Sequence, residues 1–94
     1  YGTSYTTGRG YSVSLDATAP TVTSPFSYDV EVTTIPTSTI YGAGYYRDDG
    51  YLNHMAYHAG LVRLGEKKRV YFHDIGSKTM FPSVTNRGYT SSAY

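Results

Sequence analysis

Alternating apolar and polar positions mark three short segments of the chain as β-strands. The clearest alternation lies in residues 26–35, where Val30 and Val32 share one side and acidic and hydroxyl residues occupy the other. Residues 11–23 and 69–75 alternate in the same way. Because successive side chains of a strand point to opposite faces, a period of two residues predicts a short strand in each segment.

A single helix is predicted over residues 49–64. Asp48 or Asp49 is placed to cap its N-terminus, and Gly65 is placed to end it in the left-handed conformation. Apolar residues recur at the spacing of one helix face, at Leu52, Met55, Ala56, Ala59 and Val62. Since two of these are alanine, the face is small enough to pack closely against another helix.

The chain is poor in aliphatic residues. Leu, Ile, Val and Phe together make up 17 of the 94 residues, whereas Ser and Thr number 23 and Tyr numbers 12. A chain with less than about a fifth of such apolar residues buries too little surface to offset the entropy of ordering it. We therefore expect a mostly irregular, extended chain with one short amphipathic helix and a few short strands, and not an independent globular fold.

Charge and composition divide the chain near residue 46. The first half has a formal charge of −2 and holds most of the Ser and Thr, and the second half has a charge of +3. We expect an extended arm rich in Ser, Thr and Tyr at 1–46, a helix-plus-strand segment at 47–76, and a polar, Tyr-containing tail at 77–94.

The tyrosines and one basic cluster are the expected partner-binding groups. Tyrosine combines a large contact area with a polar tip and is enriched in protein interfaces. Twelve tyrosines are more than one small core needs, so we expect some of them to contact a partner. We expect the basic residues at 63–69 to contact an acidic protein surface. The expected partner-binding residues are Tyr41, Tyr45, Tyr46, Leu52, Met55, Ala59, Arg63, Lys67, Lys68, Arg69 and Tyr71.

Nucleic acid and membrane are not expected partners. Basic residues followed by Tyr71 and Phe72 are a combination that binds single-stranded nucleic acid, but the net charge of +1 leaves a small electrostatic footprint. No apolar run is long enough to cross a membrane as a helix.

Neither catalysis nor a cofactor is expected. His54 and His58 lie one helical turn apart, and His73 is the third candidate metal ligand, but the glutamate that a zinc protease places after the first histidine is missing. The chain has no cysteine, and no serine lies in a nucleophile-elbow motif. We expect no resident metal, no small-molecule substrate and no enzymatic activity.

The two ends of the chain resemble a known class of protein. Residues 1–12, YGTSYTTGRGYS, and residues 86–94, NRGYTSSAY, look like the Tyr-rich non-helical arms of invertebrate muscle thick-filament proteins, of the paramyosin-arm and myofilin type. Filament-lining proteins of ciliary microtubules look similar. The resemblance implies a non-enzymatic accessory protein that is cytoplasmic, cytoskeletal or myofibrillar. Such a protein binds along a filament, and the filament orders it. The expected partner is a coiled-coil rod such as myosin.

A second hypothesis comes from a different class, a small independent β-rich protein-binding module. In this hypothesis the strands form a sheet with the helix across it. It requires one closed apolar cluster within a single chain, made by Leu15, Val30, Val32, Leu52, Met55, Val70 and Phe72.

Overall fold

Five of the strands form one antiparallel sheet. The computed structural model describes residues 12–16, 26–47, 50–74 and 80–94. Within these residues the sheet has the order β2-β5-β1-β4-β3, and β6 and β7 form a separate hairpin. The strands are β1 (Ser12–Asp16), β2 (Phe26–Glu31), β3 (Gly42–Ala43), β4 (Tyr45–Arg47), β5 (Lys67–Asp74), β6 (Thr85–Asn86) and β7 (Tyr89–Thr90).

The predicted alternation is confirmed where β2 pairs with β5. Val30, Val70 and Phe72 are fully buried, whereas Asp29 and Arg69 pair across the two strands on the opposite, outer face. Because a strand alternates its side chains with a period of two, this register buries one set and exposes the other. The inner face of the sheet is therefore the face that builds the core.

The helix is much shorter than predicted. Helix α1 spans Leu52–His58, and its N-cap is Tyr51, which makes no side-chain capping bond. The left-handed residue that closes the helix is Gly60, whose φ is +85°, and not Gly65. The Gly60 N–H donates to the Tyr57 carbonyl and the next N–H donates to the Ala56 carbonyl, at 3.1 and 2.9 Å. This is the Schellman arrangement, which closes the helix one turn earlier than the apolar spacing suggests.

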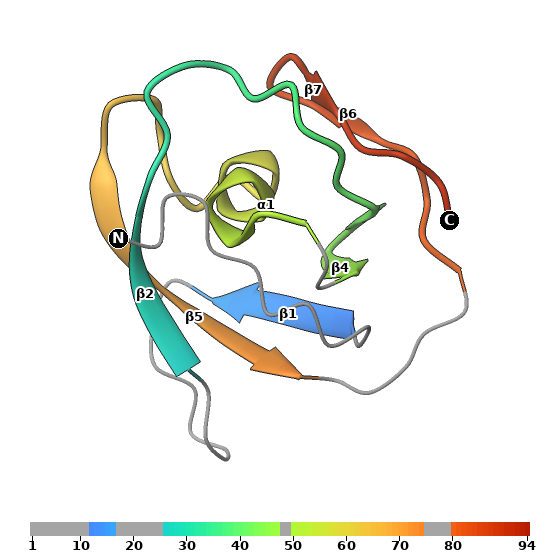
Figure 1. The fold of residues 1–94 in the computed structure, drawn as a ribbon, viewed down its shortest axis with the longest axis horizontal. Helices are drawn as coiled ribbons and strands as arrows, with labels where there is room; N and C mark the ends of the chain where they lie inside the picture. Colours follow the sequence, from blue (N-terminus) through green and yellow to red (C-terminus); the bar gives the residue numbers. More distant parts are fainter. Residues whose placement is uncertain (1–11, 17–25, 48–49, 75–79) are drawn as a thin grey trace.

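Helix α1 lies at the centre of the molecule. Figure 1 shows it end-on, with β1, β2 and β5 on one side and the β6–β7 hairpin on the other. Every residue of α1 except His54 is buried. In the part of the chain that the structure describes, no helix has the length and apolarity needed to cross a bilayer. The core consists of Val30, Val32, Ile40, Tyr46, Leu52, Met55, Ala56, Tyr57, Val62, Val70, Phe72 and Tyr89.

The expected fold class is wrong. The chain is not mostly irregular and extended, because its radius of gyration is 11.9 Å, against about 12 Å for a globule of this length. The expectation was based on the number of Leu, Ile, Val and Phe residues. It did not include the apolar surface that tyrosine, methionine and alanine side chains bury. Tyr46, Tyr57 and Tyr89 are all at least 96% buried, and Met55 and Ala56 are completely buried. Tyrosine therefore serves here as a core residue as well as a surface residue.

The three expected segments share one structure. Strands β1 and β2 lie before residue 46 and both pair with β5, which follows it. The region expected to be a polar tail contributes the β6–β7 hairpin and places Phe81 and Tyr89 in buried positions.

Replacing Leu52 with alanine is expected to destabilise the protein by about 2–5 kcal/mol, because the side chain is fully buried beside Met55 and leaves a cavity. The matched control is Leu64→Ala at a side chain that is 43% exposed, where a change within about 0.5 kcal/mol is expected. Urea unfolding of the free monomer measures both. A non-cooperative transition in the wild type, or equal losses in the two variants, would contradict this core.

Candidate functional site

A pocket with both polar and apolar lining lies between the segment that follows β2 and the start of α1. Its volume is about 380 Å³, near the lower end of the range of about 300–1,000 Å³ typical of ligand pockets. One wall is the run of residues 31–38, and the other is the first turn of the helix. The lining residues are Glu31, Val32, Thr33, Thr34, Ile35, Pro36, Thr37, Ser38, Asn53 and His54.

Asn53, a lining residue, carries a buried hydrogen-bond acceptor that has no partner. The residue is only 1% exposed, and its Nδ2 donates to the Glu31 carbonyl at 3.0 Å. Its Oδ1 is buried and has no hydrogen-bond partner. Leaving a buried polar atom unsatisfied costs about 1–3 kcal/mol. The protein therefore keeps an acceptor at a cost in stability, at the wall of a cavity.

His54 forms the other polar side of the pocket. Its Nδ1 contacts Ser38 Oγ, which is also 3.2 Å from the Tyr89 hydroxyl. The Tyr89 hydroxyl donates to the Ser38 carbonyl at 2.7 Å. The His54 ring also meets the Tyr51 ring edge-to-face, with centroids 5.4 Å apart. Burial lowers the pKa of His54, so the imidazole is neutral near pH 7.

The contact between Ser38 and His54 does not amount to a hydrolytic site. A catalytic serine needs a base that is itself oriented by a third group, together with donors aimed at a developing oxyanion. Among the described residues no carboxylate orients His54, and Ser38 is instead held by Tyr89. The network fixes the wall of the pocket.

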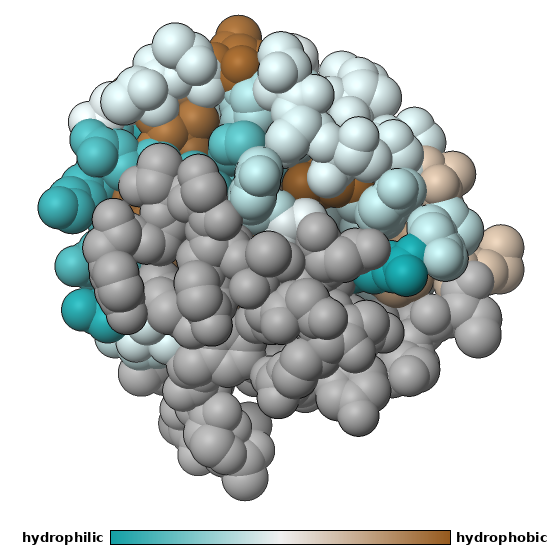
Figure 2. Space-filling view, viewed as in Figure 1, coloured by the Kyte–Doolittle hydropathy of each residue, from teal (hydrophilic) through white to brown (hydrophobic). Residues whose placement is uncertain are grey.

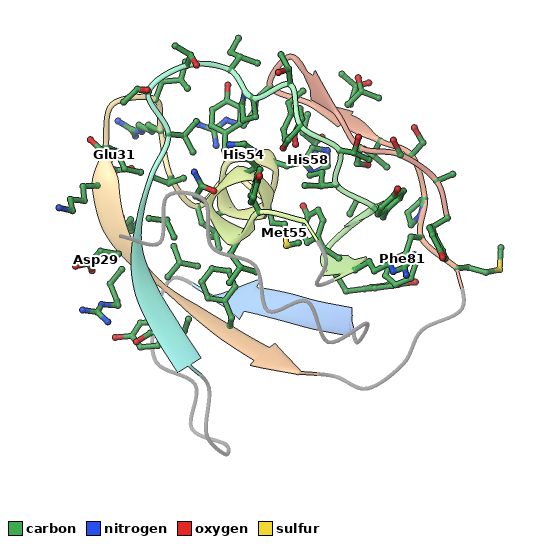
Figure 3. The ribbon with its side chains drawn as sticks, in the orientation of Figure 1. Asp29, Glu31, His54, Met55, His58 and Phe81 are labelled. Carbon is green, nitrogen blue, oxygen red and sulfur yellow. The ribbon has the colours of Figure 1, made fainter. Side chains whose placement is uncertain are left out.

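His58, the second candidate metal ligand, is fully occupied inside the protein. Its Nε2 lies 2.8 Å from the Val84 carbonyl, so this nitrogen carries the proton and donates. Its Nδ1 then accepts from the Tyr46 hydroxyl, also at 2.8 Å. Figure 3 shows His54 and His58 on α1. The side chain of His73 lies outside the described residues, and within the described ones no cluster of three metal-ligating side chains forms.

The predicted partner-binding residues range from fully buried to exposed. Tyr46, Leu52 and Met55 are 1% exposed or less and belong to the core of this chain. Tyr41 and Tyr45 are half-buried and face other aromatic rings. Of the remainder, Lys68 and Tyr71 are half-buried, and the exposed ones are Ala59, Arg63, Lys67 and Arg69.

An aromatic surface gathers Tyr41 and Tyr45 with residues from the C-terminal segment. We use this name for Tyr41, Tyr45, Arg47, Met80, Phe81 and Tyr94. The Arg47 guanidinium lies 3.8 Å from the Tyr94 ring centroid, and Tyr94 meets Tyr41 edge-to-face at 5.0 Å. Tyr45 packs 5.6 Å from Phe81 and donates its hydroxyl to the Met80 carbonyl.

Two side chains of the aromatic surface protrude into solvent. Met80 is 75% exposed and Tyr94 is 62% exposed. The main chain holds Tyr94 in place, because Phe81 and Tyr94 exchange two N–H···O bonds of 3.3 and 3.0 Å. The exposed side chains of Met80 and Tyr94 thus extend from an ordered part of the structure.

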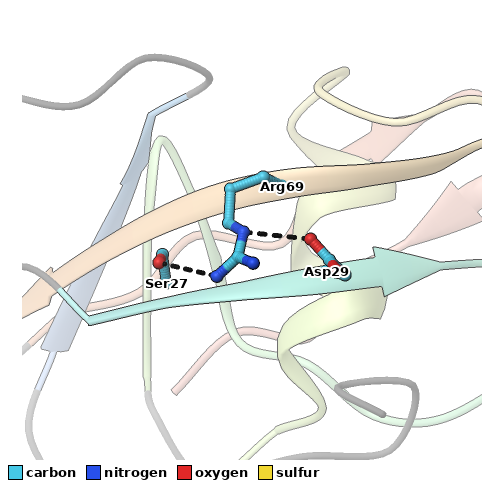
Figure 4. Close-up of polar contacts among 3 residues, drawn as sticks. All are labelled: Ser27, Asp29 and Arg69. Carbon is cyan, nitrogen blue, oxygen red and sulfur yellow. Dashed lines mark hydrogen bonds and ion pairs between the residues drawn. The ribbon is translucent and has the colours of Figure 1, made fainter.

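The predicted basic cluster is partly neutralised by β2. Arg69 Nε lies 2.9 Å from Asp29, and its Nη1 donates to Ser27, as drawn in Figure 4. Lys67 stands opposite Glu31 in the same register. Figure 2 shows hydrophilic residues on the side of the molecule where β2 and β5 lie. This surface therefore carries exposed side chains of opposite charge that face each other across the two strands. Exposed ion pairs of this kind stabilise the folded state by about 1 kcal/mol or less.

Sequence reasoning missed Asn53, Ser38 and Tyr89. Asn53 stood inside the predicted helix with no distinguishing pattern around it, and Ser38 stood in a stretch rich in hydroxyl residues. A polar residue at a core-facing helix position was the one usable signal, since Asn53 lies three positions before Ala56, which is on the predicted apolar face.

Comparison with known proteins gives no relative. No family model matches the chain, and neither the curated proteins nor the solved structures contain a significant match.

The burial of Tyr46 predicts a loss of stability at alkaline pH. Burial raises the pKa of Tyr46 to about 12, against about 10 in the unfolded chain. The folded protein therefore holds the phenol proton more tightly. The stability this gives is complete below pH 10 and is lost as pH rises towards about 12, by on the order of 2 kcal/mol.

Urea unfolding across this pH range measures the loss, with Tyr46→Phe as the control. The variant lacks the titrating group, so its stability is expected to fall less steeply over the same range. It is also expected to be less stable than wild type at neutral pH by about 1–3 kcal/mol, because His58 Nδ1 loses its donor. Identical slopes for the two proteins would contradict this role of Tyr46.

Proposed function

We propose that this protein is a self-folding, β-rich protein-binding module. The observation that supports this proposal is its closed core. Of the seven residues that the module hypothesis requires to meet, Val30, Val32, Leu52, Met55, Val70 and Phe72 belong to one buried cluster. The seventh, Leu15, lies on β1, and its side chain is outside the described residues. A chain that closes its own core presents a fixed surface to a partner.

The aromatic surface is the proposed contact with the partner protein. Protein interfaces are enriched in Tyr, Phe, Met and Arg, and their strongest contributions come from a few such side chains. Met80 and Tyr94 expose apolar area beside the ordered ring of Tyr41 and the guanidinium of Arg47. Ordering this surface before binding reduces the entropy lost on association.

The filament hypothesis loses its main premise. It required a chain that takes its shape from a neighbour, and the fold class on which it depended is wrong. Of the first segment that resembles thick-filament arms, residues 1–11 lie outside those the structure describes. A filament subunit is therefore one candidate partner of the module, without the role of ordering it.

Selection from a library of random displayed peptides on the immobilised full chain tests the proposal. Peptides enriched on the wild type are expected to bind Met80→Ser and Tyr94→Ser at least about tenfold more weakly, the loss typical of an interface anchor. Leu64→Ser is the matched control, because Leu64 is also an exposed apolar residue, at 43%, but lies outside the aromatic surface.

Circular dichroism of each variant establishes that it remains folded. Failure to enrich any peptide above a blank support would overturn the binding module. Enriched peptides that bind both variants as tightly as wild type would exclude the aromatic surface as their site.

A further inference from the structure

The chain carries two sulfur atoms, and the fold gives them opposite environments. Both belong to methionines, because the sequence contains two Met and no Cys. Met55 lies on α1 and is completely buried in the core (Figure 3), whereas Met80 is 75% exposed. An oxidant in the solvent therefore reaches one sulfur of the folded chain and is kept from the other.

Met80 lies where its oxidation would change the aromatic surface. Among the described residues, it is the most exposed of the large apolar side chains. Its main chain is fixed, because its carbonyl accepts from the Tyr45 hydroxyl at 2.8 Å and the next residue, Phe81, exchanges two main-chain bonds with Tyr94. The thioether is therefore carried at an ordered position next to two packed aromatic residues, Tyr45 and Phe81.

An exposed thioether is open to two-electron oxidation by hydrogen peroxide. One oxygen atom of the peroxide bonds to the sulfur and forms a sulfoxide, while the O–O bond breaks and water leaves. The sulfur loses two electrons and the peroxide gains them. A methionine sulfoxide reductase reverses the step, because two thiols supply two electrons, form a disulfide and release the oxygen as water.

Oxidation replaces an apolar contact group with a strongly polar one. The sulfoxide oxygen is a hydrogen-bond acceptor that water solvates in the free protein, and burying it against a partner without a donor is costly. The Tyr45 hydroxyl, which is held at this residue, already donates to the Met80 carbonyl. The oxidised surface therefore binds an apolar partner group less tightly than the reduced surface does.

We propose that Met80 is a reversible oxidation site through which peroxide weakens binding at the aromatic surface. The proposal rests on the proposed function, that the aromatic surface binds a partner protein, and adds the regulation of that contact. The burial of Met55 separates this effect from damage to the fold, because oxidation of a core methionine disrupts packing. The oxidation therefore changes the contact surface and leaves the core intact.

Peptide mass mapping after treatment of the full chain with hydrogen peroxide tests the site. Met80 is expected to react at the rate of a methionine in a short unfolded peptide. Met55 is expected to react at least about tenfold more slowly, because peroxide reaches it only when the core opens. In urea, where the core is open, the two methionines are expected to react at similar rates. Equal rates in the folded protein would contradict the site.

Affinity measurements test the effect on binding. The probes are peptides selected on the reduced full chain that contain neither Met nor Cys, so that peroxide acts on the protein alone. Complete oxidation of Met80 is expected to weaken their binding at least about tenfold, and treatment with methionine sulfoxide reductases is expected to restore it. Circular dichroism before and after oxidation establishes that the fold is retained.

Two variants, each with a single methionine, assign the effect to one sulfur. Met80→Leu keeps an apolar side chain of similar volume without an oxidisable atom, so peroxide is expected to leave its affinity, whatever the starting value, unchanged. Met55→Leu is the matched control. It keeps Met80 and is expected to lose affinity on oxidation as the wild type does.

Unchanged affinity after complete oxidation of Met80 would overturn the proposal, and so would an equal loss in Met80→Leu. Failure of the proposed function gives a different result. No peptide is then enriched on the reduced chain, and the regulation falls with the binding, although mass mapping still reports the oxidation of Met80. Enriched peptides that depend on Tyr94 but not on the oxidation of Met80 leave the module standing without this regulation.

Discussion

Burial of a seven-residue helix is the constraint on which the rest of this structure depends. A helix as short as α1 is not stable alone, since nucleation is costly and isolated helices of fewer than about 12–15 residues are marginal. It persists because the sheet covers one side and the segments at 31–41 and 80–94 cover the other (Figure 1). Its polar groups must then be satisfied within the protein. Tyr46 and Val84 satisfy His58, and Arg87 donates to the carbonyls of Tyr57 and Val62.

That demand for internal partners explains why the unpaired oxygen of Asn53 stands out. Almost every other buried polar side-chain group of the described residues has a partner, including Ser91, whose hydroxyl accepts from the Val84 N–H. The Asn53 oxygen is the exception to this rule, since it is both buried and unpaired. Among the described residues, the oppositely charged side chains on the outer face of β2 and β5 include no buried, unpaired polar atom. Their arrangement is sufficiently explained by contact with solvent.

The sequence allowed β1, β2 and β5 to be predicted, but not the four shorter strands, the fold class or the candidate site. Alternation located β2 and β5 because it is a local property, and Val30, Val70 and Phe72 are buried as it implied. The helix was predicted too long because the apolar spacing continues to Val62, although Gly60 turns the chain before it. The fold class failed because counting aliphatic residues ignored the tyrosines that fill the core. The pocket is lined by Ser38 from one segment and by Asn53 and His54 from another. A local sequence pattern does not predict contacts between segments that lie apart in the chain.

Arg87 has a consequence for the order in which the chain acquires its shape. It is the one non-glycine residue of the described part with a positive φ, +57°, and its guanidinium lies 4.5 Å from the centre of the Tyr57 ring. The last turn of the helix is therefore completed by a residue made thirty positions later during synthesis. Until the segment that carries Arg87 has been synthesised, the carbonyls of Tyr57 and Val62 lack their hydrogen-bond donor. That side of the helix then stays exposed to water. The helix therefore completes its packing only after Arg87 has been synthesised.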